Sequence, residues 1–162
     1  MTAQPPTTPA PNGVAPATTR TPIDVVTDFL DALARSDSAA ALADVDANIA
    51  YTNVSLPTVR GKRGVRRIFA GMDGRDWVGF DYVMVNVSAD DGVVLTERVD
   101  ELRIGPIVLQ FWVCGRFEVA NGRITVWRDY FDYYDMTKAL LRGLAAAVIP
   151  PLRRPLASRA PR

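Results

Sequence analysis

Charged and polar side chains occur within three stretches of the sequence whose other residues are typical of buried strands. Arg98 and Asp100 lie in VVLTERVDELRI, Asp129 lies in ITVWRDYFDYY, and Tyr51 and Asn53 lie in IAYTNV. Burying an unpaired charge costs several kcal/mol, so these residues need partners if the strands enter a core. Side chains two residues apart on a strand share a face, which places Arg98 with Asp100 and Tyr51 with Asn53.

Asp129 shares its face with Trp127 and Phe131, and a curved sheet could bring that face to Arg98 and Asp100. Two carboxylates and one guanidinium would then meet at the bottom of an apolar pocket. Burial and mutual repulsion raise the pKa of at least one carboxyl, while the guanidinium lowers the other, so that one acid donates a proton and the other accepts one. Arginine suits this bridge because it stays charged and offers several donors in a planar fork.

Tyr51 and Asn53 add a hydroxyl and an amide, which are able to hold a water molecule beside the basic carboxylate. A structural interpretation competes with this one, because an R-x-D on a single strand is more often an ion pair that only supports the fold. Residue types and spacing therefore leave two alternatives, a catalytic site or a buried structural network, and they do not name a reaction.

The composition excludes several kinds of chemistry. Histidine is absent, which excludes Ser-His-Asp and Cys-His catalysis, a histidine base and histidine-ligated zinc. Cys114 is the only cysteine, so an internal disulfide and a multi-cysteine metal site are excluded as well. A net charge of +1, from 19 basic and 18 acidic residues, favours neither nucleic acid nor an anionic membrane as a partner. Acid-base chemistry must therefore use Asp, Glu, Tyr, Lys or Cys.

The elements that would position these residues follow from hydrophobic periodicity and from caps. Thr21 as N-cap, Pro22 at the first helical position and Asp24 in the first turn predict where the first helix begins. Further helices are predicted at SAAALADV (38–45), GKRGVRRIFAGM (61–72) and DMTKALLRGLAAAV (135–148). The helix at 61–72 is expected to be amphipathic and basic on its exposed side. Strands are predicted at IAYTNV (49–54), WVGFDYVMVNVS (77–88), VVLTERVDELRI (93–104), IVLQFWVCGRFEV (107–119) and RITVWRDYFDYY (123–134).

Turn signals separate the last four strands: Asp-Gly at 91–92, Gly-Pro at 105–106 and Asn-Gly at 121–122. These signals predict an antiparallel meander. Helices followed by a strongly bent, mainly antiparallel sheet predict an α+β fold in which the helices pack on one sheet face and form a cone. A small apolar ligand would lie inside the cone.

A single domain over residues 21–150 is expected, because 162 residues fit one core. Residues 1–20 are rich in Pro, Thr and Ala and are expected to be disordered, and residues 151–162 are expected to form a basic tail. The start lacks the pattern of a signal peptide, and no apolar run reaches the roughly 18 residues expected of a spanning helix. The expected location is therefore the cytoplasm, without a membrane partner.

The chain resembles the limonene-1,2-epoxide hydrolase family in three motifs, YTN, LTERVD and GRITVWRDYFD, in this order and at these separations. The resemblance runs from Thr21 to Arg142, and IGPIVLQFWVCGRFEV and DMTKALLRGL are similar to mycobacterial members of the family. It implies a cone-shaped fold of the cystatin-like, NTF2-like or SnoaL-like kind, usually as a homodimer. It also implies hydrolysis of an epoxide in one step, without a covalent enzyme intermediate, a cofactor or a metal.

Residue by residue, the resemblance implies that Asp129 is the general base and that Tyr51 and Asn53 help it to hold the attacking water. Asp100 would protonate the epoxide oxygen, and Arg98 would link the two carboxylates. An epoxide is already strained, so its opening needs only a positioned water and a proton for the departing alkoxide. The other known route, an ester on an aspartate that a histidine-activated water cleaves, is closed to a chain without histidine.

Large apolar residues of the strands are the expected walls of the cavity. They are Trp77, Phe80, Leu102, Phe111, Trp112 and Phe117, and ordinary core packing is the alternative for each of them. Terpene, fatty-acid and steroid epoxides all fit such walls, and the mycobacterial likeness favours bulky lipid or sterol-like substrates. Two other functions of the same fold stay open, a ketosteroid-isomerase-like or polyketide-cyclase-like enzyme and a non-catalytic lipid-binding module.

Three features outside the motifs carry expectations of their own. Val113 is expected to face away from the cone and to meet a partner subunit. The apolar helix ALLRGLAAAVI is expected either to cap the mouth of the cavity or to pack across a dimer. Cys114 is expected to be a small core residue, because nothing near it in the sequence would activate its thiol.

Overall fold

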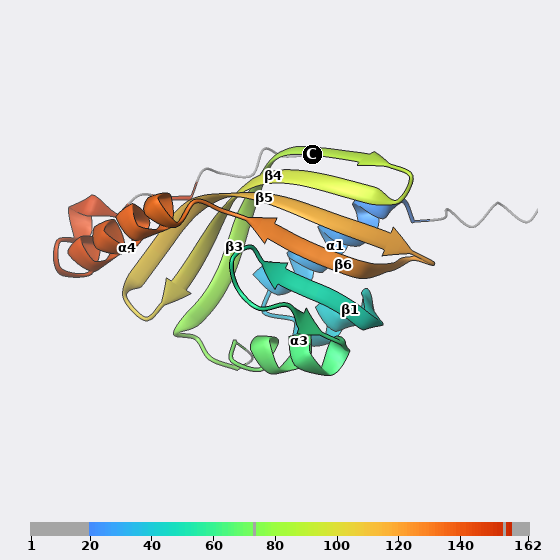
Figure 1. The fold of residues 1–162 in the computed structure, drawn as a ribbon. Coiled ribbons are helices and arrows are strands. Elements are labelled where there is room, and N and C mark those ends of the chain that lie inside the picture. The colour runs from blue at the N-terminus through green and yellow to red at the C-terminus, as the bar shows by residue number, and fades with distance from the viewer. Residues whose placement is uncertain (1–19, 73, 154, 157–162) are drawn as a thin grey trace, which may run out of the picture.

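A computed structural model of the chain describes residues 20–72, 74–153 and 155–156. These residues form an open, curved sheet of six strands with helices packed against it (Figure 1), which confirms the predicted α+β class. The elements are α1 (Pro22–Ala34), α2 (Ser38–Ala43), β1 (Val45–Asn53), β2 (Val59–Arg60), α3 (Lys62–Phe69), β3 (Val78–Asp90), β4 (Val93–Ile104), β5 (Ile107–Ala120), β6 (Arg123–Tyr130), α4 (Tyr133–Val148) and the short 3₁₀ turn η1 (Pro150–Leu152).

The strand order in the sheet is β2-β1-β6-β5-β4-β3. Strands β3 to β6 form the predicted antiparallel meander. Asn121 and Gly122 both have positive φ, 52° and 70°, as expected for an Asn-Gly hairpin turn. The sheet is mixed rather than purely antiparallel, because β1 pairs with β6 in parallel. This parallel pairing brings the first strand in sequence next to the last one.

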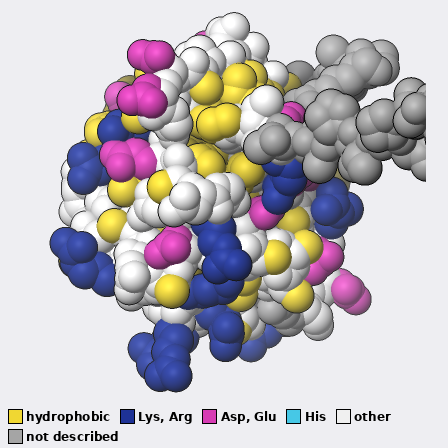
Figure 2. Space-filling model, turned by 90° about the vertical axis from the view of Figure 1, so that its right-hand side faces the viewer, with side chains coloured by type: hydrophobic (Ala, Val, Ile, Leu, Met, Phe, Trp, Pro, Cys, Tyr) yellow, Lys and Arg dark blue, Asp and Glu magenta, His cyan; other side chains and the backbone are white. Residues whose placement is uncertain are grey.

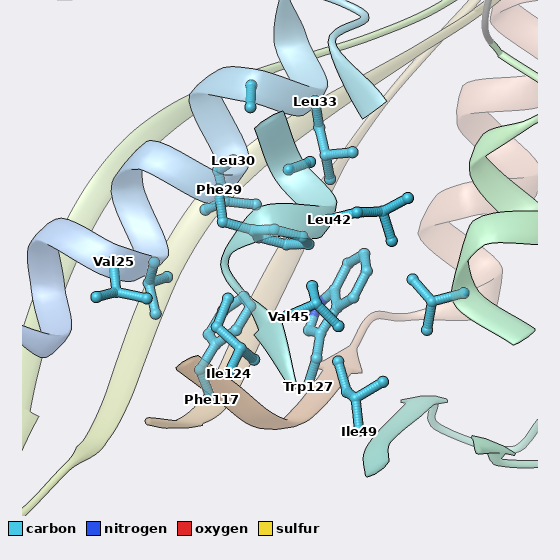
Figure 3. Close-up of a cluster of buried hydrophobic side chains, with 14 of the residues drawn as sticks. Val25, Phe29, Leu30, Leu33, Leu42, Val45, Ile49, Phe117, Ile124 and Trp127 are labelled. Atoms are coloured by element: carbon cyan, nitrogen blue, oxygen red, sulfur yellow. The ribbon is translucent and has the colours of Figure 1, made fainter. Parts of the chain in front are cut away.

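Helix α1 begins as its cap residues predict. The Thr21 side chain accepts a hydrogen bond from the Asp24 backbone N at 3.2 Å, and the Asp24 carboxylate accepts one from the Thr21 backbone N at 2.9 Å. The helix packs on one face of the sheet, where Phe29 and Leu30 are completely buried. Figure 3 shows Phe29 pointing from α1 toward Trp127, which comes from β6. This face is the inner face of the sheet, and the main core lies on it.

Helix α3 is amphipathic, as expected. Val65 and Phe69 are buried, whereas Arg63, Arg66 and Arg67 are exposed. Figure 2 shows Lys and Arg side chains grouped over the lower part of the molecule, at the height of α3 in Figure 1. The helix is shorter than predicted, and the two-residue strand β2 before it was not expected.

The boundary between β6 and α4 differs from the prediction. The strand ends at Tyr130 instead of continuing to Tyr134, and the helix already begins at Tyr133. The reason is Asp132, whose carboxylate caps the helix by accepting hydrogen bonds from the backbone N of Tyr134 and Asp135 at 2.7 and 3.0 Å. Helix α2 also ends two residues earlier than predicted, and β1 begins four residues earlier.

Helix α4 runs beside the half of β5 that extends beyond the end of β6 (Figure 1). The Arg142 guanidinium donates to the Gln110 carbonyl at 3.2 Å, and Gly143 lies against the Val108 carbonyl, where a larger residue would not fit. The helix thereby covers an otherwise open strand edge. Among the helices of the described residues, none combines the length and apolar character needed to span a bilayer.

The predicted segments at the two ends of the chain are only partly described. Residues 1–19 of the expected disordered segment, and residues 154 and 157–162 of the expected tail, lie outside the described residues. Arg20, at the end of the first segment, donates to Asp28 and Asp44 at 2.8 Å each.

Candidate active site

The strand register brings the three predicted charged residues together, although β5 lies between their strands. Arg98 on β4 donates from Nε to Asp100 Oδ1 at 2.8 Å and from Nη2 to Asp100 Oδ2 at 3.1 Å. The same Nη2 donates to Asp129 Oδ1 on β6 at 2.8 Å. One guanidinium thus links both carboxylates, with the fork geometry that a lysine could not provide.

The three side chains are enclosed by the protein. Arg98 is completely buried, and Asp100 and Asp129 are each only 5% exposed. Burial raises the pKa of Asp100 to about 6, because the charge of Arg98 and its hydrogen bonds only partly offset the lost hydration. Burial would lower the pKa of Arg98, but the charges of Asp129 and Asp100 outweigh it and raise that pKa above its ordinary value. The Asp100 carboxyl therefore keeps its proton to a higher pH than an ordinary aspartate does.

Two neighbours that the sequence did not single out complete the surroundings of Arg98. Its Nη1 donates to Thr96 Oγ1 at 3.1 Å, and Thr96 is paired across the strands with Gly115 of β5. A side chain at Gly115 would meet both the guanidinium and the Thr96 hydroxyl. A glycine inside a predicted strand is the signal that could have indicated this close approach.

Strand β1 brings the remaining two predicted residues beside Asp129. In the parallel ladder Tyr51 is paired with Trp127, and Asn53 is paired with Asp129. The Asn53 amide Nδ2 donates to the Tyr51 hydroxyl at 2.8 Å. Burial, followed by the negative charge of Asp129, raises the pKa of Tyr51, so the hydroxyl stays protonated. All five predicted residues therefore belong to one cluster.

The second oxygen of Asp129 also has a partner. The indole Nε1 of Trp127 donates to Asp129 Oδ2 at 2.9 Å, while Oδ1 takes the hydrogen bond from Arg98. The Tyr51 ring stacks on the same indole, with ring centroids 4.0 Å apart.

The carboxylates open onto an apolar cavity of about 190 Å³. Tyr51, Asn53, Asp100 and Asp129 line its polar end, with Arg98 beneath them. Apolar side chains from strands and helices form the rest: Leu33, Ile68, Phe69, Met72, Phe80, Leu102, Phe111, Val113, Trp127, Phe131 and Met136. A polar end that faces a water-excluding wall is the arrangement in which a small apolar molecule with one reactive polar group can bind.

Half of the predicted wall residues lie at this cavity, namely Phe80, Leu102 and Phe111. The prediction for Trp112 is wrong, because strand alternation puts it on the opposite face from Phe111, where it is 45% exposed and donates to Glu97 at 3.0 Å. Trp77 lies outside, 54% exposed, just before β3. Phe117 is completely buried, but in the core, stacked under Trp127.

The expectation for Val113 is also wrong. Its side chain is buried and lines the cavity, because it lies directly opposite Arg98 and shares that inward face. Cys114, the next residue, lies on the outer face and is half-buried rather than in the core. The wall residues from helices and connecting segments, such as Leu33, Met72 and Met136, were not predicted. Their positions depend on how α1, the segment after α3, and α4 pack on the sheet.

A second groove, of about 420 Å³, lies between α4, η1 and the ends of β4 and β5. Glu101, Gln110, Arg142 and Arg153 contribute polar side chains to a lining that is otherwise mainly apolar. Its lining holds no pair of carboxylates and includes none of the five clustered residues. The chemistry described above therefore belongs to the smaller, apolar cavity.

Comparisons with known proteins show what the chain is similar to. Residues 20–142 match the model of the limonene-1,2-epoxide hydrolase catalytic domain. Epoxide hydrolase EphG of Mycobacterium tuberculosis is 49% identical over 128 residues, which are 79% of this chain and 85% of that protein. The solved structure of an M. tuberculosis LEH-like epoxide hydrolase superposes with a TM-score of 0.79 at 48% identity, covering 83% of this chain and 95% of that one.

More distant structures share only the fold. A SnoaL-like protein of Shewanella putrefaciens superposes with a TM-score of 0.65 at 15% identity, covering 74% of this chain and 96% of that one. An NTF2-like protein of Cytophaga hutchinsonii superposes with a TM-score of 0.57 at 20% identity over 74% of this chain and 97% of that one. The expected SnoaL-like and NTF2-like architecture is thereby confirmed.

Proposed function

The chain belongs to the limonene-1,2-epoxide hydrolase family and is an epoxide hydrolase, and on this premise we propose that it converts an apolar epoxide to a vicinal diol in one step. Asp129 acts as general base and Asp100 as general acid. The observation that carries the proposal is the single guanidinium of Arg98 that joins both carboxylates at the polar end of an apolar cavity.

The hydrogen-bond donors and acceptors around Asp129 support one orientation of the attacking water. Because the Tyr51 oxygen already accepts a hydrogen bond from Asn53, its own proton is free to point at a water oxygen. The water then donates one hydrogen bond to the Asp129 carboxylate and the other to the Asn53 amide oxygen, and only the first proton is transferred when the water attacks. Its remaining lone pair is left to attack the ring carbon.

Asp100 suits the role of acid because its pKa is raised to about 6. A carboxyl in this range carries a proton for part of the time near neutral pH and can still release it, which is the condition for efficient general acid catalysis. The proton goes to the epoxide oxygen as the carbon–oxygen bond breaks, so no free alkoxide has to form in the apolar cavity.

Arg98 keeps the electrostatics of the site balanced during the reaction. Before attack Asp129 is charged and Asp100 is neutral; afterwards Asp129 is neutral and Asp100 is charged. Since Arg98 contacts both carboxylates, the buried group of three stays neutral in total while the negative charge changes place. A change of net charge in a buried site would cost far more.

The size of the cavity limits how much of the substrate it encloses. A cavity of about 150 Å³ holds one benzene molecule, so the cavity of about 190 Å³ encloses the epoxide and the carbons nearest to it. A terpene epoxide fits largely inside. A lipid or sterol-like epoxide fits only if the rest of the molecule extends through the mouth.

A panel of terpene, fatty-acid and sterol epoxides, assayed for diol formation, tests the proposal. We expect Asp129→Asn and Asp100→Asn to lower kcat by at least about 100-fold without unfolding the protein, because each removes one proton-transfer group. The matched control is Asp90→Asn at the exposed end of β3, which should keep full activity. Full activity of Asp100→Asn would remove the proposed acid.

A single turnover in ¹⁸O-labelled water tests the one-step route. Solvent oxygen should enter the diol in the first turnover, whereas an ester intermediate on an aspartate would deliver an unlabelled carboxylate oxygen. Deuterium exchange into a ketone without epoxide turnover would instead favour the isomerase or cyclase alternative. Binding of apolar ligands without turnover, indifferent to both Asp→Asn changes, would favour a lipid-binding module.

We also propose that the protein acts as a cytoplasmic homodimer. The outer face of the sheet, opposite the cavity, carries exposed apolar side chains at Val85, Leu95 and Trp112. Such side chains on neighbouring strands make a surface that a second copy of the chain can cover. The half-buried thiol of Cys114 on this face fits a reducing compartment.

A further inference from the structure

The indole of Trp127 contacts both parts of the group that is proposed to activate water. Its Nε1 donates to Asp129 Oδ2 at 2.9 Å, and its ring stacks on the Tyr51 ring at 4.0 Å with an angle of 27° between the planes. We propose that Trp127 is a positioning residue, which holds the Asp129 carboxylate and the Tyr51 hydroxyl in one fixed arrangement around the attacking water. This inference rests on the proposed roles of Asp129 and Tyr51.

A general base needs such a support because an aspartate side chain is not rigid. The terminal torsion of Asp has a broad energy profile, so a carboxylate held by one oxygen can still turn. Arg98 holds Oδ1 and Trp127 holds Oδ2, and together they fix the plane of the carboxylate. Each oxygen keeps a second lone pair, and these are the sites left for water.

Trp127 itself is held firmly by the core. It is only 6% exposed, and Phe29 meets it edge to face at 5.1 Å while Phe117 stacks parallel to it at 6.1 Å. Figure 3 shows the indole within this cluster of rings from α1 and β5. An indole enclosed on several sides can transmit the rigidity of the core to the groups that it contacts.

The pairing of β1 with β6 also fixes the positions of these residues relative to one another. Tyr51 is the ladder partner of Trp127, and Asn53 is the ladder partner of Asp129. The four residues form two pairs on the same face of β1 and β6, with the pair of Thr52 and Arg128 between them. Trp127 is the one of the four that touches the base through its N–H and the water-holding tyrosine through its ring.

A positioning role makes two predictions that mere packing does not. First, loss of the indole N–H should lower kcat and leave KM unchanged, because the reacting water and not the substrate loses its alignment. Second, the acid limb of the kcat/KM profile should move to higher pH, since this N–H stabilises only the ionised carboxylate.

The first experiment uses Trp127→Phe, which keeps a ring against Tyr51 and removes the donor. We expect kcat to fall about 10- to 100-fold, as for other small losses of alignment, and the acid limb to shift upward. The matched control is Phe29→Leu, which loosens the same cluster without touching Asp129. It should lower thermal stability but leave the position of the acid limb unchanged.

A second experiment removes the N–H without changing the size of the ring. The two exposed tryptophans are first replaced in Trp77→Phe/Trp112→Phe, whose own kinetics serve as the reference. Trp127 is then replaced biosynthetically by benzothienylalanine, in which sulfur stands in place of N–H. The same fall in kcat and the same upward shift of the acid limb are expected. Kinetics and a pH profile equal to those of the reference would overturn the inference, even if Trp127→Phe is impaired.

An NMR measurement separates this inference from the proposed roles. In the parent with Trp127 alone, the indole N–H resonance should move with pH at the midpoint of the acid limb, and this movement should disappear in Asp129→Asn. If Asp129→Asn keeps full activity, the proposed base is wrong. If Asp129→Asn is inactive and the indole resonance does not titrate, only the role of Trp127 is wrong.

Discussion

Arg98 is the largest side chain that the fold buries completely, and its burial needs a reason other than stability. Buried ion pairs are often no more stabilising than apolar residues of the same volume, because desolvation offsets the attraction. The chain nevertheless keeps an arginine and two aspartates below an apolar cavity. Three ionisable groups retained at such a cost support the proposed role in proton transfer.

The pKa of Asp100 predicts the alkaline side of the activity profile. Asp100 must be protonated to donate, and burial raises its pKa to about 6, so kcat/KM should fall as the pH rises through about 6. A pH series from 4 to 9 with an uncharged epoxide measures this limb. A profile that stays flat up to pH 8 would contradict the assignment of Asp100 as the acid.

Pleated strands position the site more than any single contact does. Thr96, Arg98 and Asp100 share one face of β4, and their ladder partners on β5 are Gly115, Val113 and Phe111. The small partner lies beside the guanidinium and the large ones lie beside the cavity. Alternation along two strands thus sorts the residues into a charged end and an apolar end.

Gly115 on β5 lies so close to Arg98 that a larger residue there should disturb the site. A methyl group there would meet Arg98, Thr96 and Phe117, so Gly115→Ala should displace the guanidinium from its two carboxylates. We expect a loss of about 1–3 kcal/mol in the free energy of unfolding and a fall in kcat of about 100-fold.

Gly79→Ala on β3 is the matched control, since its methyl group would meet only the mobile end of the Arg103 side chain. It should leave kcat nearly unchanged. Thermal unfolding and kcat, measured on both variants, test this prediction. Equal effects of the two substitutions would show that Gly115 is not special for Arg98.

At the scale of the whole molecule, the cavity lies on the inner face of the sheet, where the helices pack. The inner face of the sheet, α1, the end of α3 and the start of α4 surround the site, while no helix of the described residues covers the outer face of the sheet (Figure 1). α4 exposes Leu141 and Val148 strongly as well. Both surfaces are more apolar than a lone molecule in water requires, which agrees with the proposed homodimer.

Light scattering after gel filtration tests the dimer and its surface. The wild-type protein should have twice the 17.7 kDa mass of the chain. Trp112→Glu should reduce it to the single mass, because a buried carboxylate on the outer sheet face would lack a partner. Leu56→Glu, at an exposed position after β1, is the control and should remain dimeric. A dimer that survives Trp112→Glu but not Leu141→Glu would place the interface on α4.

Periodicity and caps were sufficient to predict the helices, the meander and the inward faces of Arg98, Asp100 and Asp129, since these features depend on local backbone geometry. The family motifs then assigned roles to five residues, and the structure brings all five into one cluster. The wall residues were harder to predict. Trp112 and Phe111 are both large and aromatic, and only the side of the strand on which each side chain lies distinguishes them.

The sequence by itself therefore determined which chemistry is possible, because a chain without histidine that pairs arginine with two acids has few ways to transfer protons. Tertiary structure alone decided what surrounds that chemistry. The parallel pairing of β1 with β6 and the space that Gly115 leaves for Arg98 both join residues that are distant in sequence. Such contacts arise only when strands and helices share one core, so no local pattern encodes them.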